Sequence, residues 1–286
     1  MLSIAAATCS LPPTGAWAQS LPVPAQGEIP VAVVLGKDAE VLDFTGPLEV
    51  FAHAQTSDGH PLFKPYFVAA SKDAVKVSGG LRVLPDYTFA DAPAPKVVVI
   101  PALSEPPPAL LDWVRRVSAG TDVTMSVCTG AFVLADTGLL DGKPATTHHG
   151  AYLRFAGTYP KVQLREGARY VETGNLATAG GVTSGIDLAL RVVERYAGRG
   201  QAQAVADIIE HQGTGWLHPE VNQAYASLPP STAQNPICPL CGMQADKAIH
   251  SEFGGKTFYF CSKDDKAFFD EYPEVAKKIL AKDTAL

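Results

Sequence analysis

Cys128 combines a reactive residue type with a position that could support chemistry. It ends a segment, 122–128, that predicts a strand, and it precedes a segment, 130–140, that predicts a helix. A strand-to-helix turn exposes a side chain at the carboxyl edge of a sheet, where open α/β folds bind ligands. The helix N-terminus is expected to lower the pKa of the thiol from about 8.5. The alternative is a buried, inert cysteine, a common core residue.

Three more cysteines, Cys238, Cys241 and Cys261, form a second group with chemical potential. Three thiolates in one small unit suit a soft or borderline metal such as zinc or copper(I). In an exported protein the same residues could instead form a disulfide, either Cys238–Cys241 or one of these with Cys261. A unit of about 50 residues usually needs one of the two for stability.

Composition limits the classes of function. The chain has 286 residues, of which 47% are hydrophobic, and a formal net charge of -6. No basic patch stands out, so a nucleic-acid partner is not expected. No apolar run reaches the roughly 18 residues that a membrane span needs.

The first 28 residues read as a signal peptide and leader. An apolar stretch is followed by Ala16-Trp17-Ala18, the small-residue pattern that precedes a signal-peptidase cut, although a basic start is missing. We therefore expect a periplasmic or otherwise exported protein, with Cys9 removed along with the peptide. The alternative is a disordered leader rich in alanine and proline.

Alternating strand and helix patterns predict an α/β domain over 29–215 with a largely parallel sheet. Residues 226–236 are rich in Pro, Ser, Thr and Asn. We therefore interpret 216–236 as a linker and 237–286 as a separate small domain. A short amphipathic helix interrupted by Pro273 is expected within the latter. The expected strands of the large domain are 29–36, 63–71, 96–102, 122–128, 143–148 and 169–174, and its helices are 47–55, 107–120, 130–140, 181–198 and 202–212.

Four motifs, in order, resemble the ThiJ/PfpI superfamily of the class I glutamine-amidotransferase-like fold. The resemblance implies a flavodoxin-like three-layer αβα sandwich, no cofactor for this domain, and relatives that often form homodimers. The motifs are VLDFTGPLEVF (41–51), which is similar to the family's first loop, KVVVIPA (96–102), SVCTGAFVLADTGLLDGKPATTHH (126–149) and GNLATAGGVTSGIDLALRVVE (174–194).

The resemblance assigns roles to individual residues. Cys128 matches the nucleophile, and Asp43 matches the acidic residue that approaches the thiol. Thr129 replaces the histidine of protease-like members, which argues against a peptidase and is similar to the isonitrile hydratase branch. His148 matches a histidine near the thiol that could orient it or could be structural. Gly150 stands where amidotransferases carry a carboxylate, so a full Cys-His-Glu triad is absent.

The predicted oxyanion loop departs from the family pattern. The chain reads Pro101-Ala102-Leu103 where many members have two glycines. Backbone N–H groups of Ala102, Leu103 and Gly130 could still bind substrate or a developing negative charge. Because alanine and leucine take a positive φ only at a cost, either the loop is reshaped or the oxyanion hole is weaker.

The cysteine-rich segment 238–280 resembles the YHS domain, a small metal-associated module, through CPLCGM and the later FYFCS. Asp265 stands where that family often has another cysteine. The fourth ligand would thus be Asp265, His250 or Met243, or the site is open. Met243 would favour copper(I), whereas zinc would favour His250 or Asp265.

Three functions remain open at this level. The first is an exported hydratase in which Cys128 attacks a small electrophile such as an isonitrile. Asp43 would then protonate nitrogen or activate water, giving an N-substituted formamide. The second is a non-catalytic ligand sensor, because the same domain resembles the sensing half of AraC-type regulators. The third is a periplasmic metal-handling protein that acts through its C-terminal domain.

Overall fold

The computed structural model describes residues 20–24, 27–229, 231–232 and 234–283. Its largest feature is a seven-stranded sheet in the order β10-β11-β7-β6-β1-β2-β5, in which only β10 runs antiparallel to its neighbour. The α/β class with a mostly parallel sheet is therefore confirmed. The strands are β1 Ile29–Val34, β2 Phe63–Ala69, β5 Tyr87–Thr88, β6 Val97–Ile100, β7 Val123–Val127, β10 Tyr170–Thr173 and β11 Leu176–Ala179.

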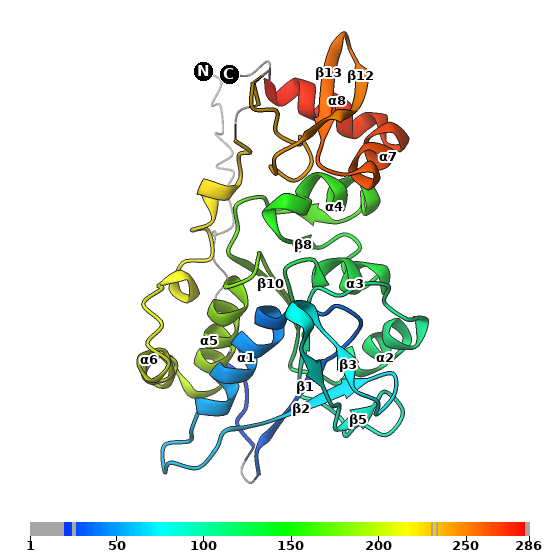
Figure 1. The fold of residues 1–286 in the computed structure, drawn as a ribbon. Helices are drawn as coiled ribbons and strands as arrows, with labels where there is room; N and C mark the ends of the chain where they lie inside the picture. Colours follow the sequence, from blue (N-terminus) through cyan, green and yellow to red (C-terminus); the bar gives the residue numbers. More distant parts are fainter. Residues whose placement is uncertain (1–19, 25–26, 230, 233, 284–286) are drawn as a thin grey trace, which may run out of the picture.

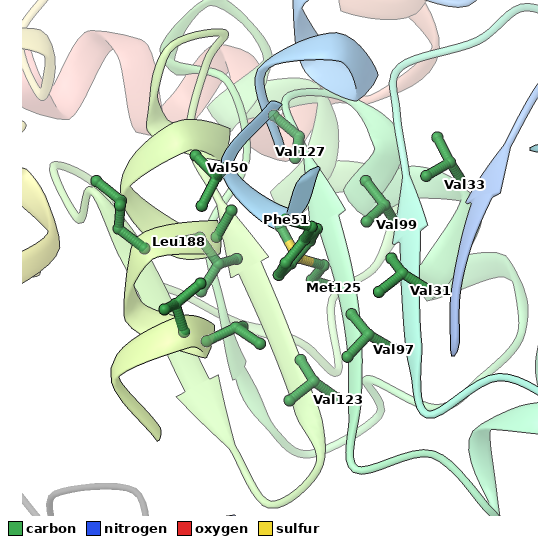
Figure 2. Close-up of a cluster of buried hydrophobic side chains, with 14 of the residues drawn as sticks. Val31, Val33, Val50, Phe51, Val97, Val99, Val123, Met125, Val127 and Leu188 are labelled. Carbon is green, nitrogen blue, oxygen red and sulfur yellow. The ribbon is translucent and has the colours of Figure 1, made fainter. Parts of the chain in front are cut away.

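Helices cover both faces of this sheet and make three layers (Figure 1). One face packs against α1 (Val41–His53), α5 (Ser184–Ala197) and α6 (Arg199–Ile208). The other packs against α2 (Pro108–Ser118) and α3 (Gly130–Asp136). Alternate residues of each central strand enter the two cores, as strand geometry requires. Figure 2 shows the first core, which includes Val99 and Met125 from the strands and Phe51 and Leu188 from the helices.

The strand order places three chain segments at one edge of the sheet. Taken in chain order, the five long parallel strands run 2-1-3-4-5, so the direction of winding reverses between β1 and β6. Ligand sites of open α/β sheets lie at the carboxyl ends of the strands beside such a reversal. The segments that leave β1, β6 and β7 there carry Asp43, Ala102 and Cys128, respectively.

Several elements differ from the sequence prediction. Helix α1 begins at Val41, although 41–46 was expected as a loop and the helix only from residue 47. Gly46 permits this early start, because a Cβ there would lie 2.9 Å from Cγ1 of Ile186 on α5. The strand expected over 143–148 shortens to β8 (Pro144–Ala145), which pairs with β9 (Gln163–Leu164) outside the main sheet. Strand β11 was not predicted.

The segment expected as a linker begins within the α/β packing. Trp216, in the short helix η3 (Gly215–Leu217), is buried in the first core. Its carbonyl accepts a hydrogen bond of 2.8 Å from the Tyr170 hydroxyl. A second short helix, η4 (Gln223–Tyr225), follows the buried residue Asn222. The α/β packing therefore extends past residue 215.

The C-terminal unit consists of a hairpin and two helices. The hairpin pairs β12 (Asp246–Phe253) with β13 (Lys256–Phe260), and α7 (Lys263–Glu271) and α8 (Pro273–Asp283) follow. Pro273 ends one helix and starts the next, as its sequence position predicted. Phe260 and Phe269 lie in a core that also contains Leu153 of α4 (Tyr152–Thr158). Figure 1 shows the unit packed against α4 at one end of the α/β domain.

Two expectations fall on the N-terminal residues. The signal-peptide pattern and Cys9 lie within residues 1–19, outside the described residues. Among the helices that the structure describes, none is long and apolar enough for a membrane crossing.

The remaining short elements are β3 (Val75–Lys76), β4 (Arg82–Val83), the 3-10 turn Ser78–Gly80 and η2 (His149–Ala151).

Candidate functional site

Cys128 occupies a strained turn between β7 and α3. Its φ of 58° is a left-handed backbone conformation that costs an L-residue roughly 1–2 kcal/mol. The turn is held in place because the Cys128 N–H donates to the Gly180 carbonyl at 2.8 Å and the Thr147 hydroxyl donates to the Cys128 carbonyl at 2.9 Å. The residue is 8% exposed. This is the geometry of a nucleophile elbow with a mostly covered side chain.

Gly130 brings the start of α3 close to the end of β6. A Cβ at this position would lie 2.2 Å from the Ile100 carbonyl oxygen and 2.8 Å from that of Pro101. These are backbone atoms that cannot move aside, so only glycine fits. Gly130, predicted as a substrate-binding residue, thus sets the distance between the elbow and the loop after β6.

Asp43 lies in the first turn of α1 and is fully buried. Its Oδ2 accepts a 3.0 Å hydrogen bond from the Ala102 N–H, whereas its Oδ1 has no hydrogen-bond partner among the described residues. Burial raises the pKa of Asp43 to about 7, and the charge of Glu40 adds to this rise. The Ala102 N–H and the Cys128 thiol both favour the carboxylate and limit the shift. The acid therefore titrates near neutral pH.

The pKa of Cys128 moves in the direction opposite to the one expected from sequence. Burial raises it to about 12, and the negative charges of Asp43 and Glu40 contribute to the rise. The Thr129 N–H donates toward the sulfur and lowers the pKa, but desolvation outweighs it. The expectation of a lowered pKa was wrong because the thiol is covered and lies near the acidic groups Asp43 and Glu40. At neutral pH the sulfur carries its proton.

The loop at Ala102 and Leu103 avoids the left-handed conformation that glycines would allow at these positions. Neither residue has a positive φ. Glu105, later in the same loop, has a φ of 50°. The Ala102 N–H is bound to Asp43. The Leu103 side chain lies over Gly36, where a Cβ would be 3.1 Å from its Cδ2. The Ala102 N–H therefore orients the acid instead of facing an oxyanion.

His148 is held by packing beside the elbow. Its Nδ1 accepts a hydrogen bond of 3.1 Å from the Gly150 N–H, which leaves the proton of the neutral ring on Nε2. A Cβ at Gly181 would lie 1.9 Å from the ring, so the ring rests directly on that glycine. Burial and the neighbouring His149 lower the His148 pKa. Near pH 7 the ring therefore supplies no positive charge to stabilise a thiolate.

Three contributors escaped the sequence analysis. Glu40 precedes α1, and its charge raises the pKa of both Asp43 and Cys128. Its signal was an acidic residue three positions before Asp43 in the same motif. Thr147 and Gly181 support the elbow and His148, but nothing in their local sequence separates them from ordinary loop residues.

The C-terminal unit gathers a second group of polar side chains. The ligand atoms of Cys238, Cys241, Cys261 and Asp265 all lie within 4.8 Å of one another. Tetrahedral zinc with bonds of about 2.3 Å would place its sulfurs roughly 3.8 Å apart, so these four groups fit around one ion with modest adjustment. All four described cysteines are free thiols, with Sγ of Cys241 and Cys261 3.4 Å apart.

The other two predicted ligands lie apart from this group. His250 is on the hairpin, where its ring centre lies 6.2 Å from that of Tyr259, and it is not part of the four-residue cluster. The Met243 side chain is 62% exposed. Its carbonyl accepts a 2.8 Å hydrogen bond from the Cys238 N–H, so this residue shapes the loop through its backbone.

Charge within the cluster favours cation binding. A hydrogen bond from the Cys241 thiol lowers the pKa of Cys238 to about 7, and the same contact raises the pKa of Cys241. Burial alone would raise the pKa of Asp265, yet the thiols of Cys261 and Cys238 together with Arg154 hold it below its usual value. A carboxylate and an easily formed thiolate thus face the same point.

Comparison with known proteins defines the class. Residues 30–195 match the DJ-1/PfpI family, so the chain belongs to this family. The match agrees with the ThiJ/PfpI resemblance of the sequence motifs. Among its relatives is the isonitrile hydratase of Pseudomonas putida, which is 34% identical over 186 residues that cover 63% of this chain and 78% of the relative. The family match ends before the C-terminal unit begins.

Other relatives share the domain in a different setting. The HTH-type transcriptional regulator CdhR of Pseudomonas aeruginosa is 29% identical over 150 residues, which cover 51% of this chain and 44% of the regulator. Among solved structures, a ThiJ/PfpI family protein from Pseudomonas syringae has a TM-score of 0.58 and 24% identity, covering 78% of this chain and 99% of that protein. That likeness supports the fold alone.

Proposed function

We propose that this protein is a cysteine-dependent hydratase of small electrophiles, with isonitriles as the substrate class. The observation that carries the proposal is the pairing of a protonated thiol with a buried carboxyl group whose pKa is about 7. A general base works best when its pKa lies near the working pH. The 34% identity to an isonitrile hydratase supports the substrate class.

The proposed reaction uses Asp43 as a proton carrier for Cys128. Ionised Asp43 takes the thiol proton and passes it to the isonitrile carbon while sulfur bonds to that carbon, giving an enzyme-bound thioimidate. Water then adds to the carbon, with one proton going to nitrogen through Asp43 and the hydroxyl staying on carbon. Breakage of the carbon–sulfur bond releases the N-substituted formamide, and sulfur regains a proton. The net change is addition of one water, without oxidation or reduction.

Turnover of a small alkyl isonitrile by the purified chain, followed as formamide by proton NMR, tests this proposal. Cys128→Ala should abolish turnover, and Asp43→Asn should reduce it by roughly 10²–10⁴-fold, the usual contribution of a positioned acid or base. Asp141→Asn, at an exposed carboxylate paired with Lys161, should leave it unchanged. Full turnover by Cys128→Ala would exclude the mechanism.

A second candidate is a ligand sensor that performs no chemistry. The observations that favour it are the 8% exposure and raised pKa of Cys128, which make the thiol a poor nucleophile until it is deprotonated. Regulators among the relatives support it as well. Under this alternative, isonitriles or other small ligands would raise the melting temperature of both wild type and Cys128→Ala without product.

The C-terminal unit supports a metal-binding role, which we propose in addition. Cys238, Cys241, Cys261 and Asp265 would hold the ion, with zinc or copper as candidates from the sequence. A bound ion would supply cross-linking of a small core rather than reaction chemistry. If metal binding by the C-terminal unit is the main role of the protein, the protein is a metal-handling protein. Metal analysis after purification without added metal, with thiol counts, separates ligation from a disulfide.

We also propose that residues 1–28 direct export. The support is the Ala16-Trp17-Ala18 pattern followed by Gln19. Expression of the full chain followed by N-terminal sequencing of the recovered protein tests it. A mature protein that starts at Gln19 in the periplasmic fraction is expected, whereas an intact N-terminus in the cytoplasm would exclude export.

A further inference from the structure

The Asp265 carboxylate contacts both the cysteine cluster and the α/β domain. Asp265, on α7, is buried and directs its Oδ2 toward two thiols of the cluster, 3.3 Å from Sγ of Cys238 and 3.2 Å from Sγ of Cys261. Its Oδ1 accepts a 2.6 Å hydrogen bond from Nη2 of Arg154, which lies on α4 of the α/β domain. The two oxygens of a single side chain thus serve different units.

Arg154 is fixed in this position by its surroundings. Its guanidinium group lies 5.2 Å from the ring centre of Phe268, one turn after Asp265 on α7. Next to it, Leu153 enters the hydrophobic core of the C-terminal unit. Gly157, at the far end of α4, leaves space for Phe268 and Val275, because a Cβ there would lie 3.0 Å and 3.1 Å from them. The ion pair therefore lies at the edge of a packed contact, with Asp265 mostly covered and the Arg154 side chain 38% exposed.

We propose that Arg154 is a positioning residue for the metal centre of the C-terminal unit, and that this centre is a zinc site with three thiolates and the Oδ2 of Asp265. This inference rests on the metal-binding role proposed above. A charged hydrogen bond that occupies Oδ1 fixes the orientation of the carboxylate and leaves Oδ2 for the ion, as outer partners of metal ligands do. A hard carboxylate oxygen favours zinc over copper(I), which prefers sulfur ligands alone.

The shared carboxylate also links metal binding to docking of the two units. Zinc binding releases the protons of the thiols and fixes Asp265 in place. Fixing Asp265 strengthens its contact with Arg154, and by linkage docking on α4 strengthens zinc binding by the same factor. Arg154 thus makes the α/β domain part of the outer shell of the site, although it supplies no ligand.

Zinc affinity of the full chain, measured by competition with a chromophoric chelator, tests the proposal without using the Cys128 reaction. Arg154→Met keeps the aliphatic stem over Phe268 and removes the charge, so it should bind zinc 10–100-fold more weakly. Arg154→Lys should recover part of the loss, because it restores the positive charge. Arg82→Met, at an exposed arginine on β4, serves as the matched control and should bind as wild type does.

The outcomes separate this inference from the proposed metal-binding role. If wild type takes up neither zinc nor copper, both fail, whereas uptake of copper without zinc leaves the metal role standing and overturns the zinc site. If wild type binds zinc tightly and Arg154→Met binds it equally tightly, the metal role stands and the role of Arg154 is overturned.

Cobalt(II) loading adds an independent readout. Asp265→Asn should alter the visible d–d bands of a tetrahedral site while keeping the sulfur charge-transfer bands, and an unchanged spectrum would exclude Asp265 as a ligand. Circular dichroism of each metal-free variant checks that it folds.

Discussion

In the proposed reaction, Cys128 and Asp43 share one proton, and burial makes both groups hard to ionise. The pKa is about 7 for the Asp43 carboxyl group and about 12 for the thiol. Between these values the acid is ionised while sulfur keeps its proton. The Asp43 Oδ1 has no hydrogen-bond partner among the described residues, so in the proposed reaction it is the oxygen that would receive that proton. Substrate that places an electrophilic carbon near sulfur would complete the transfer.

The raised pKa of Asp43 predicts a pH-dependent loss of stability. Because the folded pKa of about 7 exceeds the ordinary value of 3.8, the folded state prefers the protonated acid. Stability from this group is therefore full below about pH 4 and falls as pH rises to 7, by about 4 kcal/mol at most for a shift of roughly three units. Asp43→Asn removes this titration.

Urea unfolding of wild type and Asp43→Asn at pH 5 and pH 8 measures the effect. The variant should gain stability relative to wild type at the higher pH. Asp141→Asn, at an exposed carboxylate, should show no comparable change between the two pH values. A stability difference between Asp43→Asn and wild type that is independent of pH would contradict the raised pKa.

At this scale the sequence did not predict the charge states of the candidate site. Cys128 and Asp43 were expected together, and their pKa values respond to each other. The direction of the thiol pKa was wrong because local sequence shows a helix N-terminus but not the depth of cover above it. The use of the Ala102 N–H by Asp43 was equally hidden, since it joins residues 59 positions apart.

Among the elements, glycines at close contacts set the geometry of the elbow and its neighbours. Gly181→Ala would place a Cβ 1.9 Å from the His148 ring and push the ring aside. We expect it to destabilise the fold by about 1–3 kcal/mol, the range for overpacking. Gly200→Ala, inside α6 with no atom within 4 Å of the added Cβ, should stabilise by about 0.5–1 kcal/mol. Thermal unfolding of both variants measures the contrast, and equal effects would contradict the close packing of His148.

The secondary structure was predictable where burial repeats along the chain. Strands β1, β6 and β7 lie within their expected ranges, and the all-apolar runs of β1 and β6 suit strands covered on both faces. The start of α1 was missed because Gly46-Pro47 reads as a turn, whereas here contact with α5 overrides that local preference. Strand β11 is four residues long and follows a tight turn after β10, so its pattern was too short to separate from the following loop.

In the whole molecule, one continuous segment links the two sites. Thr147 holds the Cys128 carbonyl, His148 follows beside the elbow, and α4 then carries Arg154 to the C-terminal unit. Near the start of this segment, a Cβ at Gly150 would lie 3.1 Å from the Cys241 carbonyl oxygen. The C-terminal unit is therefore packed against the chain that leaves the elbow (Figure 1).

This arrangement predicts that a change far from every proposed metal ligand will weaken zinc binding. Gly157→Leu would drive a side chain into Phe268 and Val275, where even a Cβ has only 3.0–3.1 Å. The C-terminal unit should then dock poorly, Asp265 should lose Arg154, and zinc affinity should fall about as far as in Arg154→Met, by 10–100-fold. Gly120→Leu, at a glycine whose nearest contact would be 3.8 Å, is the matched control and should leave affinity unchanged. Chelator competition measures the zinc affinity. The rate of proteolysis in the 226–236 segment measures the docking, and we expect this rate to be higher in Gly157→Leu. Unchanged zinc affinity despite faster proteolysis would show that the site is independent of the α/β domain.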